Sequence, residues 1–278
     1  MSSILVFRTE CYKILHRRQS LILLLPALLA FLIVLGQAHG VITLAASTAS
    51  AQSGTTLLDT VFLVWSVESG LGFVGLLCLL CVLFASLSFA GEREGGQIKL
   101  ALLRIGKRRD VVLGKFLAIV IVSFASILLT LAASALGYLF FAPEGQRVLS
   151  GACIYGLSLA TFAVNLGLNL LELLLLLALT FLLGLYAGPF VTFVLTMIVL
   201  YGASTLAGGT NLFARLLPLH WANTLILGEN AAGAIWSVLF AVISSFVLLA
   251  LTTMRAQRFP HKIPNFLKFH IDKRFSSR

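Results

Sequence analysis

The chain has 278 residues, of which 59% are hydrophobic and only 11% are charged. A soluble domain of this size cannot bury so much apolar surface, so the composition excludes an ordinary soluble protein. It predicts an all-α, polytopic membrane protein. The formal net charge of +10 does not indicate nucleic-acid binding, because membrane proteins collect Lys and Arg in their cytoplasmic loops.

Residues 1–19 predict a helix that lies at the cytoplasmic surface of the membrane. Apolar side chains recur along one side of this segment, and Arg8, Lys13 and Arg17 occupy the rest, as in helices that lie in the plane of an interface. The apolar stripe consists of Ile4, Phe7, Cys11, Ile14 and Leu15. The following apolar run is longer than the core of a signal peptide, so we expect a retained first span.

Residues 20–254 contain six segments that are apolar enough to cross a bilayer, for which a helix needs about 20 residues. These segments are Leu21–Leu44, Leu58–Ala90, Val111–Phe141, Gly151–Leu183, Gly188–Ala207 and Ala231–Met254. We therefore expect a six-span transmembrane domain over 20–254, followed by a basic cytoplasmic tail over 255–278.

Two of these segments are longer than one crossing needs. In the second, Gly70, Gly72 and Gly75 are expected to break the helix and leave Thr60–Ser69 as an outer extension. In the fourth, a fold into two spans at Asn165–Asn169 would give seven crossings and place the basic tail outside. We therefore expect a single span there, over about 165–183, preceded by an interfacial helix or a tilted extension.

The connector between the second and third segments is unusually charged. Its 24 positions, Glu92–Lys115, hold ten of the chain's 30 charged residues. Acidic residues and the pair Gly95–Gly96 come first, and Ile98, Leu102 and Ile105 then recur at helical spacing among basic residues. This order predicts a short amphipathic helix over 92–110, with acidic groups at its N-terminus.

The distribution of basic residues predicts the orientation. With an even number of spans, the N-terminal segment, the connector and the C-terminal tail share one side and hold 18 of the 20 Lys and Arg residues. Only Arg147 and Arg215 fall on the other side. Both termini are therefore expected in the cytoplasm, with the chain in the cell membrane.

The sequence contains no recognisable catalytic motif, so we expect a non-catalytic chain. Gly106-Lys107 and Gly114-Lys115 lack the Ser or Thr of a phosphate-binding loop. The five histidines lie outside the spans, and Cys78 and Cys81 have no nearby ligand pair, so we expect small packing cysteines and no metal site.

A few polar residues fall within the apolar segments. Asn165, Asn169 and Glu172 share a helix face at spacings of four and three, which favours either a transport pathway or hydrogen bonds that hold helices together. A row of hydroxyls in the third segment favours close helix packing over substrate contact; it comprises Ser123, Ser126, Thr130 and Ser134. Glu68 is expected near the outer boundary, in contact with water.

The connector "EREGGQIKLALLRIGKRRDVVLGK" resembles that of the membrane subunits of type-2 ABC exporters, whose second and third spans are joined by an acidic-glycine-leucine-basic segment ending in Lys. The matching residues are Glu92, Glu94, Gly96, Leu100, Leu102, Arg108, Arg109 and Lys115. The six-span layout resembles that family too. Gln97 stands where the family often has Thr, and Ile105 where it often has Pro.

The resemblance implies that residues 92–110 form a coupling helix that docks on a separate ATPase subunit. The contacts with the ATPase are expected from Glu92, Glu94, Gly96, Ile98, Leu102, Ile105, Arg108 and Arg109. It also implies that residues 1–19 are an elbow helix. The partners would be a second permease, identical or related, and two ATPase subunits that bind ATP and Mg²⁺, while this chain itself carries no cofactor.

The expected function is export of a hydrophobic or amphipathic molecule, and the family suggests a drug or an antimicrobial peptide. Two other classes remain open. An ion-coupled secondary transporter or channel would use Glu172 and would need no ATPase. A membrane scaffold or sensor subunit would move no substrate at all.

Overall fold

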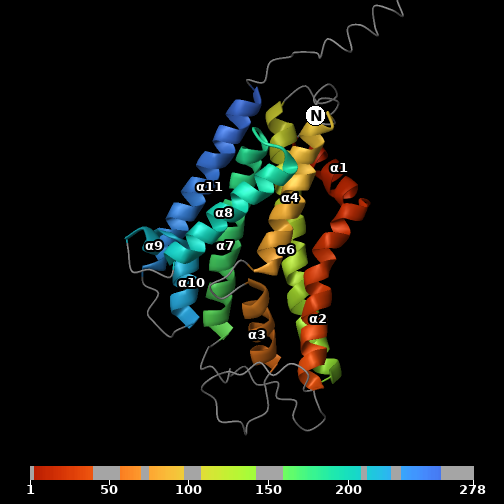
Figure 1. The fold of residues 1–278 in the computed structure, drawn as a ribbon, viewed down its shortest axis with the longest axis vertical. Helices are drawn as coiled ribbons and strands as arrows, with labels where there is room; N and C mark the ends of the chain where they lie inside the picture. Colours follow the sequence, from red (N-terminus) through yellow and green to blue (C-terminus); the bar gives the residue numbers. More distant parts are fainter. Residues whose placement is uncertain are drawn as a thin grey trace, which may run out of the picture.

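The computed structural model describes residues 3–39, 57–69, 75–96, 108–141, 159–207, 212–226 and 233–257. Within these ranges the regular elements are helices. Most of the long helices run roughly along the longest axis of the molecule, and α8 crosses the bundle obliquely (Figure 1). The expected all-α membrane fold is confirmed at this level.

The N-terminal segment folds into α1 (Ser3–Leu15), a 3₁₀ turn η1 (Arg18–Leu24) and α2 (Leu25–Ala38). Part of the predicted apolar stripe is buried, with Ile14 only 4% exposed, but Leu15 is 70% exposed and Val6 is buried instead. This difference arises because α1 packs against α6, and that contact selects a different side of the helix. Ser126 of α6 also donates a hydrogen bond to the Leu23 carbonyl of η1, at 2.6 Å.

The second apolar segment is divided into α3 (Leu57–Ser69) and α4 (Leu76–Glu94). Gly75 has an extended backbone immediately before α4, which confirms the predicted break at this glycine. Gly70 and Gly72 lie outside the described residues. Two residues join α3 to α7. The rings of Phe62 and Phe162 are 6.1 Å apart, and Trp65 Nε1 donates to Asn165 Oδ1 at 3.2 Å.

The middle of the chain forms the two longest helices, α6 (Arg108–Phe141) and α7 (Leu159–Gly184). Helix α7 runs without interruption through Asn165 and Asn169, so the alternative of two spans folded at these residues is wrong. A single helix is favoured because its interior contains no Pro, and the two Asn side chains can satisfy their polar groups within the bundle.

The C-terminal part contains α8 (Pro189–Ala207), the short helices α9 (Leu212–Leu216) and α10 (Pro218–Ile226), and α11 (Ala234–Gln257). Pro189 and Pro218 each open their helix, where a missing backbone N–H costs nothing. Helices α10 and α11 both pack against α7, so α7 is enclosed from several sides.

Five described helical segments are long and apolar enough to cross a membrane. They are Gln19–Ala38, Leu76–Glu94, Arg109–Phe141, Leu159–Gly184 and Ala234–Ala256. The apolar stretch of α8, Pro189–Ala203, is shorter. The chain is therefore a multi-pass membrane protein.

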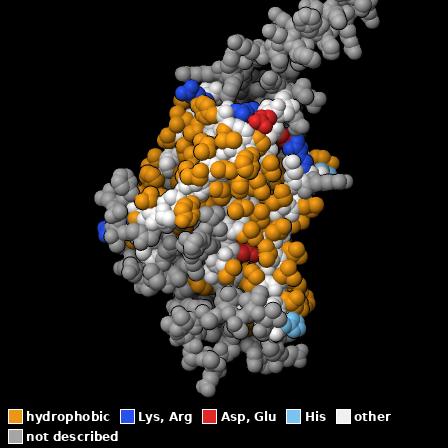
Figure 2. Space-filling view, in the orientation of Figure 1, with side chains coloured by type: hydrophobic (Ala, Val, Ile, Leu, Met, Phe, Trp, Pro, Cys, Tyr) orange, Lys and Arg blue, Asp and Glu red, His pale blue; other side chains and the backbone are white. Residues whose placement is uncertain are grey.

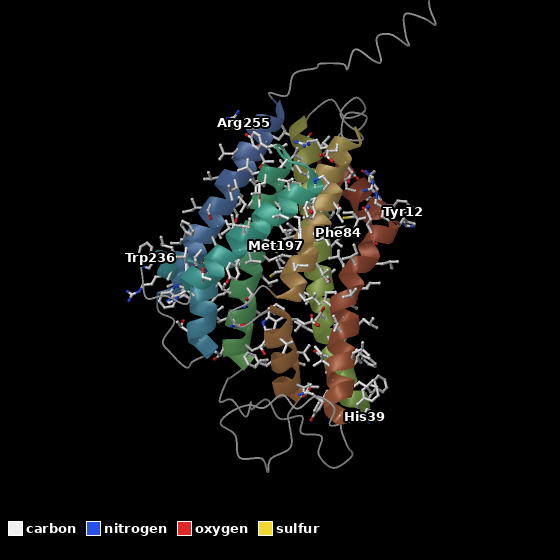
Figure 3. The ribbon with its side chains drawn as sticks, viewed as in Figure 1. Tyr12, His39, Phe84, Met197, Trp236 and Arg255 are labelled. Carbon is white, nitrogen blue, oxygen red and sulfur yellow. The ribbon has the colours of Figure 1, made fainter. Side chains whose placement is uncertain are left out.

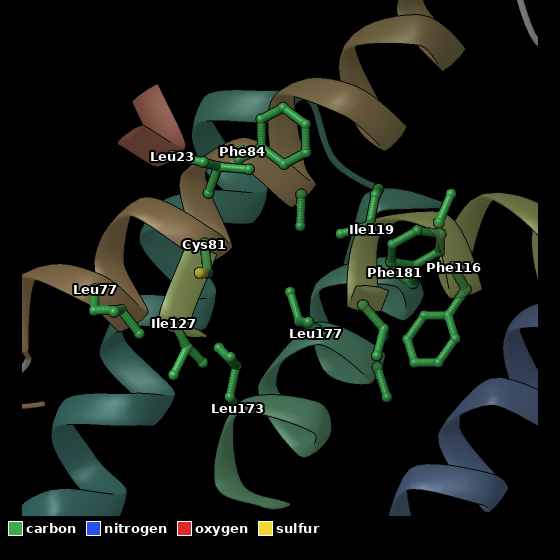
Figure 4. Close-up of a cluster of buried hydrophobic side chains, with 14 of the residues drawn as sticks. Leu23, Leu77, Cys81, Phe84, Phe116, Ile119, Ile127, Leu173, Leu177 and Phe181 are labelled. Carbon is green, nitrogen blue, oxygen red and sulfur yellow. The ribbon is translucent and has the colours of Figure 1, made fainter. Parts of the chain in front are cut away.

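The core lies where α4, α6 and α7 meet (Figure 4). Phe181 of α7 stacks on Phe89 of α4 with ring centroids 4.3 Å apart, and meets Phe116 of α6 edge-on at 5.2 Å. Such offset and edge-to-face pairs are favourable beyond their buried area. Gly184 allows this approach, because a Cβ there would lie 2.9 Å from the Phe89 ring.

The surface separates apolar and charged side chains. Hydrophobic side chains cover much of the visible face, and Lys, Arg, Asp and Glu side chains gather near one end of the molecule (Figure 2). Tyr12 and Arg255 lie toward this charged end, and His39 lies toward the opposite end (Figure 3). A broad apolar band with charges beyond it is the arrangement that a lipid bilayer requires.

Candidate functional site

The predicted connector begins at the end of α4, and the structure corrects its boundaries. Helix α4 continues through Glu94, and α6 begins at Arg108, so the ends of the expected 92–110 helix belong to the helices on either side. Gly96 has φ of +72°, the left-handed conformation that commonly follows a helix C-terminus. The glycine pair therefore ends α4, and residues 97–107 lie outside the described residues.

Glu92 is the buried centre of an ionic junction between three elements. One of its carboxylate oxygens pairs with Lys13 of α1 at 2.7 Å and with Arg17, and the other accepts from Lys115 of α6. Lys115 also pairs with Glu10 at 3.1 Å. We call these five residues, Glu10, Lys13, Arg17, Glu92 and Lys115, the ionic junction.

The burial of the ionic junction determines its role. Glu92 is 6% exposed and Lys115 is 3% exposed. Removing such charges from water costs several kcal/mol per ion, and this cost is offset only by close, complementary partners. Burial also raises the pKa of the neighbouring Cys11 thiol, and the Glu10 carboxylate raises it further. The ionic junction therefore fixes α1, α4 and α6 to one another at the charged end.

The next residue of α4 makes a different connection. Arg93 donates hydrogen bonds to the carbonyl oxygens of Leu185 and Ala187, the second at 3.1 Å. These carbonyls belong to the turn between α7 and α8. The Glu94 carboxylate lies so close to Gly188 that a Cβ there would be 2.5 Å from Oε1. The end of α4 therefore contacts α1 and α6 through Glu92, and the α7–α8 turn through Arg93 and Glu94.

The remaining residues of the expected coupling site are only partly placed. Ile98, Leu102 and Ile105 lie outside the described residues, as does the side chain of Arg108. Arg109 is exposed at the start of α6. The structure places Glu92, Glu94 and Gly96 at the C-terminal end of α4, where Glu92 pairs with basic side chains of this same chain.

The polar residues of α7 separate into two kinds. Asn165 is 3% exposed; it accepts from Trp65 of α3 and donates to the Ala222 carbonyl of α10 at 2.8 Å. Asn169 donates back to Asn165 Oδ1 at 3.1 Å. Asn165 therefore holds three helices together, which supports the hydrogen-bonding interpretation at this position.

Glu172 and Glu68 are different from these amides. Glu172 is 3% exposed, and its Oε2 has no hydrogen-bond partner among the described residues. Glu68 of α3 is 2% exposed, and within the same described part of the chain neither of its carboxylate oxygens has a partner. The expectation of a hydrated Glu68 is wrong, because this side chain is almost completely covered by protein.

The hydroxyl row of α6 fits the expectation of close packing at three of its positions. Ser126 donates to the backbone of η1, and Thr130 and Ser134 donate to carbonyls of their own helix, at 3.0 and 2.8 Å. Among the described residues, no three His, Cys, Asp or Glu side chains are gathered in a way that could hold a metal ion.

Sequence reasoning missed most of the ionic junction. The sequence pattern assigns Lys13 and Arg17 to the membrane surface and Lys115 to the connector, and it gives no role to Glu10. The pairing of these residues depends on the tertiary approach of α1 to α6. A signal was present at Lys115: this residue stands within an apolar run, where an unpaired cation would be costly. Gly114 was a second signal, because a Cβ there would meet Val6 Cγ1 at 2.8 Å.

The sequence also matches one known family over most of its length. No curated protein matches the chain. The model of the family described as "Protein of unknown function (DUF2705)" matches residues 21–259, a range that includes every described helix after α1 apart from the first residues of η1. The chain therefore belongs to the DUF2705 family.

Proposed function

We propose that this chain is the permease subunit of an ATP-driven exporter, in which a separate ATPase subunit moves the helices through the connector at 92–110. Six spans, with α8 as the fifth, would place both termini and the connector in the cytoplasm of the cell. Two permease chains and two ATPase subunits would form the transporter, and residues 1–19 would act as its elbow helix.

The observation that carries this proposal is the divided contact at the end of α4. Three consecutive residues, Glu92, Arg93 and Glu94, connect the base of the connector to α1, α6 and the α7–α8 turn. A displacement of the connector would therefore reach several helices at once. Packed elements tend to switch between discrete arrangements, as a two-state transporter requires.

The sequence supports a division of labour between subunits. It has no phosphate-binding loop, so ATP and Mg²⁺ would be bound by the partner. The apolar positions Ile98, Leu102 and Ile105 would meet the ATPase subunit, and Arg108 and Arg109 would face its acidic groups or the lipid headgroups. The cargo would cross between the two permease chains as a hydrophobic or amphipathic molecule.

The test is co-purification from native membranes with a tagged chain. We expect the wild type to retain a protein with a phosphate-binding loop, and Ile98→Asp/Leu102→Asp/Ile105→Asp to lose it while still inserting in the membrane. The control is Leu128→Asn/Leu136→Asn, since both leucines lie on the exposed apolar face of α6. Equal retention of the ATPase by the triple variant would contradict the coupling role.

An ion-coupled transporter is a second candidate, because Glu172 is buried with an unpartnered oxygen. It predicts proton-dependent flux in vesicles that contain only this chain. The exporter predicts that no flux occurs until the ATPase subunit and ATP are added.

A further inference from the structure

Two buried acids lie in the interior of the bundle without any basic partner among the described residues. The described Lys and Arg side chains that form ion pairs or hydrogen bonds to carboxylates belong to the ionic junction at the charged end. Glu68 and Glu172 instead keep oxygens that accept no hydrogen bond from the described residues. Figure 2 shows acidic atoms within the apolar body, away from the charged end.

The contacts between α3 and α7 determine where these acids lie relative to each other. Phe62 meets Phe162, and three residues later Trp65 meets Asn165. The two helices therefore run in the same direction with the same register. Three residues further along both helices, Glu68 of α3 lies at the level of Leu168 and Asn169 of α7. At about 1.5 Å rise per residue, Glu172 follows about one helical turn further along α7.

The environment of Glu68 and Glu172 favours an organic cation as the ligand. An ionised carboxylate inside a bilayer costs a few kcal/mol unless a cation or water compensates it. Aromatic faces attract cations as well, and Trp65 lies about one helical turn before Glu68 on α3. A small metal ion is less suited, because Ca²⁺ takes six to eight oxygen ligands and Mg²⁺ takes six.

We propose that Glu68 and Glu172 recognise a positively charged group on the transported molecule, so that the cargo is a cationic amphiphile. This inference rests on the proposed export function, and it adds a charge to a cargo otherwise expected to be apolar. In the structure both carboxylates are covered by protein. The cation therefore enters in another arrangement of the helices, when α3 and α7 separate.

The experiment measures binding of a probe cation to the full chain in lipid nanodiscs, without the ATPase. Radiolabelled tetraphenylphosphonium is the probe, and tetraphenylborate, which has the same shape and the opposite charge, is its matched control. We expect saturable binding of the cation and none of the anion. Glu68→Gln and Glu172→Gln should each raise the Kd at least tenfold, and Glu172→Asp should recover part of the loss.

The protein controls separate charge from folding. Asp110→Asn removes one negative charge at the start of α6, away from the site, and should leave the Kd unchanged. The Gln variants are nearly isosteric with Glu, so the same gel-filtration profile as wild type shows that they fold. Unchanged cation binding in both Gln variants overturns the proposal, and so does a Glu172→Asp variant that binds as weakly as Glu172→Gln.

Other outcomes separate this inference from the proposed function. If the ATPase co-purifies but the cation does not bind, this inference is overturned and the export function stands. If carboxylate-dependent binding occurs and no ATPase co-purifies, the exporter is overturned. If Glu172→Gln abolishes only pH-driven proton uptake and leaves cation binding intact, Glu172 is a proton site and the cargo assignment is wrong.

Discussion

Two regions of this molecule bury carboxylates, and they do so in opposite ways. At the charged end, Glu92 is surrounded by Lys13, Arg17 and Lys115. In the interior, Glu68 and Glu172 keep carboxylate oxygens that no described residue satisfies. All three side chains are at most 6% exposed, so burial alone does not distinguish the regions. The two regions differ in whether basic side chains surround the buried carboxylate.

The difference indicates what each region contributes. A buried charge with a full set of partners is stable in one geometry and holds the elements that supply them. A buried charge without partners is a cost that folding alone does not explain, and such residues inside membranes commonly mark a substrate or ion pathway. In the proposed transporter, the ionic junction would connect the helices mechanically, and the interior acids would recognise the cargo.

The largest expected effect is the loss of Glu92. Glu92→Ala leaves Lys13, Arg17 and Lys115 together without the central carboxylate, and removing one partner of a buried pair costs roughly 3–5 kcal/mol. We expect the free energy of unfolding to fall by about that amount, measured by denaturation in mixed detergent micelles. Glu94→Ala is the matched control, because this neighbour is exposed and should cost under about 0.5 kcal/mol.

A double-mutant cycle tests whether the effect belongs to the junction. Glu92→Ala combined with Lys115→Ala should cost less than the sum of the single variants, with a coupling of about 1–3 kcal/mol. Strict additivity would show that the two residues act separately. It would contradict the conclusion that the ionic junction connects the helices as one unit.

The same contrast explains what could be predicted from the sequence. The positions of α4, α6, α7 and α11 agree with the apolar segments to within several residues, because span length and apolar composition are local properties. The break at Gly75 was predicted for the same reason, since a glycine acts on the backbone around it. The Asn165–Asn169 contact is also local, because it needs only helical spacing.

The tertiary contacts of Glu92 and the burial of Glu68 could not be predicted from the sequence. The approach of α1 to α6 brings Lys13 and Arg17 to Glu92, and nothing in the periodicity of either segment specifies that approach. The burial of Glu68 depends on the packing of α3 within the bundle. Both features are contacts between distant parts of the chain, and a single sequence constrains such contacts weakly.

The next effect in size tests the close approach that makes the ionic junction possible. A Cβ at Gly114 would lie 2.8 Å from Val6 Cγ1 and 3.2 Å from the Phe7 backbone nitrogen. Overpacking of this kind costs about 1–3 kcal/mol, partly offset by the better helix propensity of Ala. We therefore expect Gly114→Ala to lower the free energy of unfolding by about 1 kcal/mol.

Two further variants make the Gly114 result specific. Val6→Ala should remove part of the clash, so the double variant should be less affected than the sum of the two single variants. Gly167→Ala in α7 is the control, because nothing lies within 4 Å of its Cβ position. This control should be neutral or slightly stabilising. Equal effects at Gly114 and Gly167 would show that α1 is not tightly held against α6.

The smallest expected effect concerns the interior acids, and its sign is the most informative. Glu172→Gln and Glu68→Gln each remove an ionisable group whose oxygens lack partners and replace it with a neutral group of similar size. Since no ion pair is lost, we expect a change within about 0.5 kcal/mol, or a small gain. The measurement is the same micelle denaturation, in the absence of any cationic ligand.

Glu92→Gln, the identical chemical change at the ionic junction, should instead cost several kcal/mol. A loss at Glu172 or Glu68 as large as at Glu92 would mean that these acids hold the fold together, and the functional contrast between the two regions would disappear.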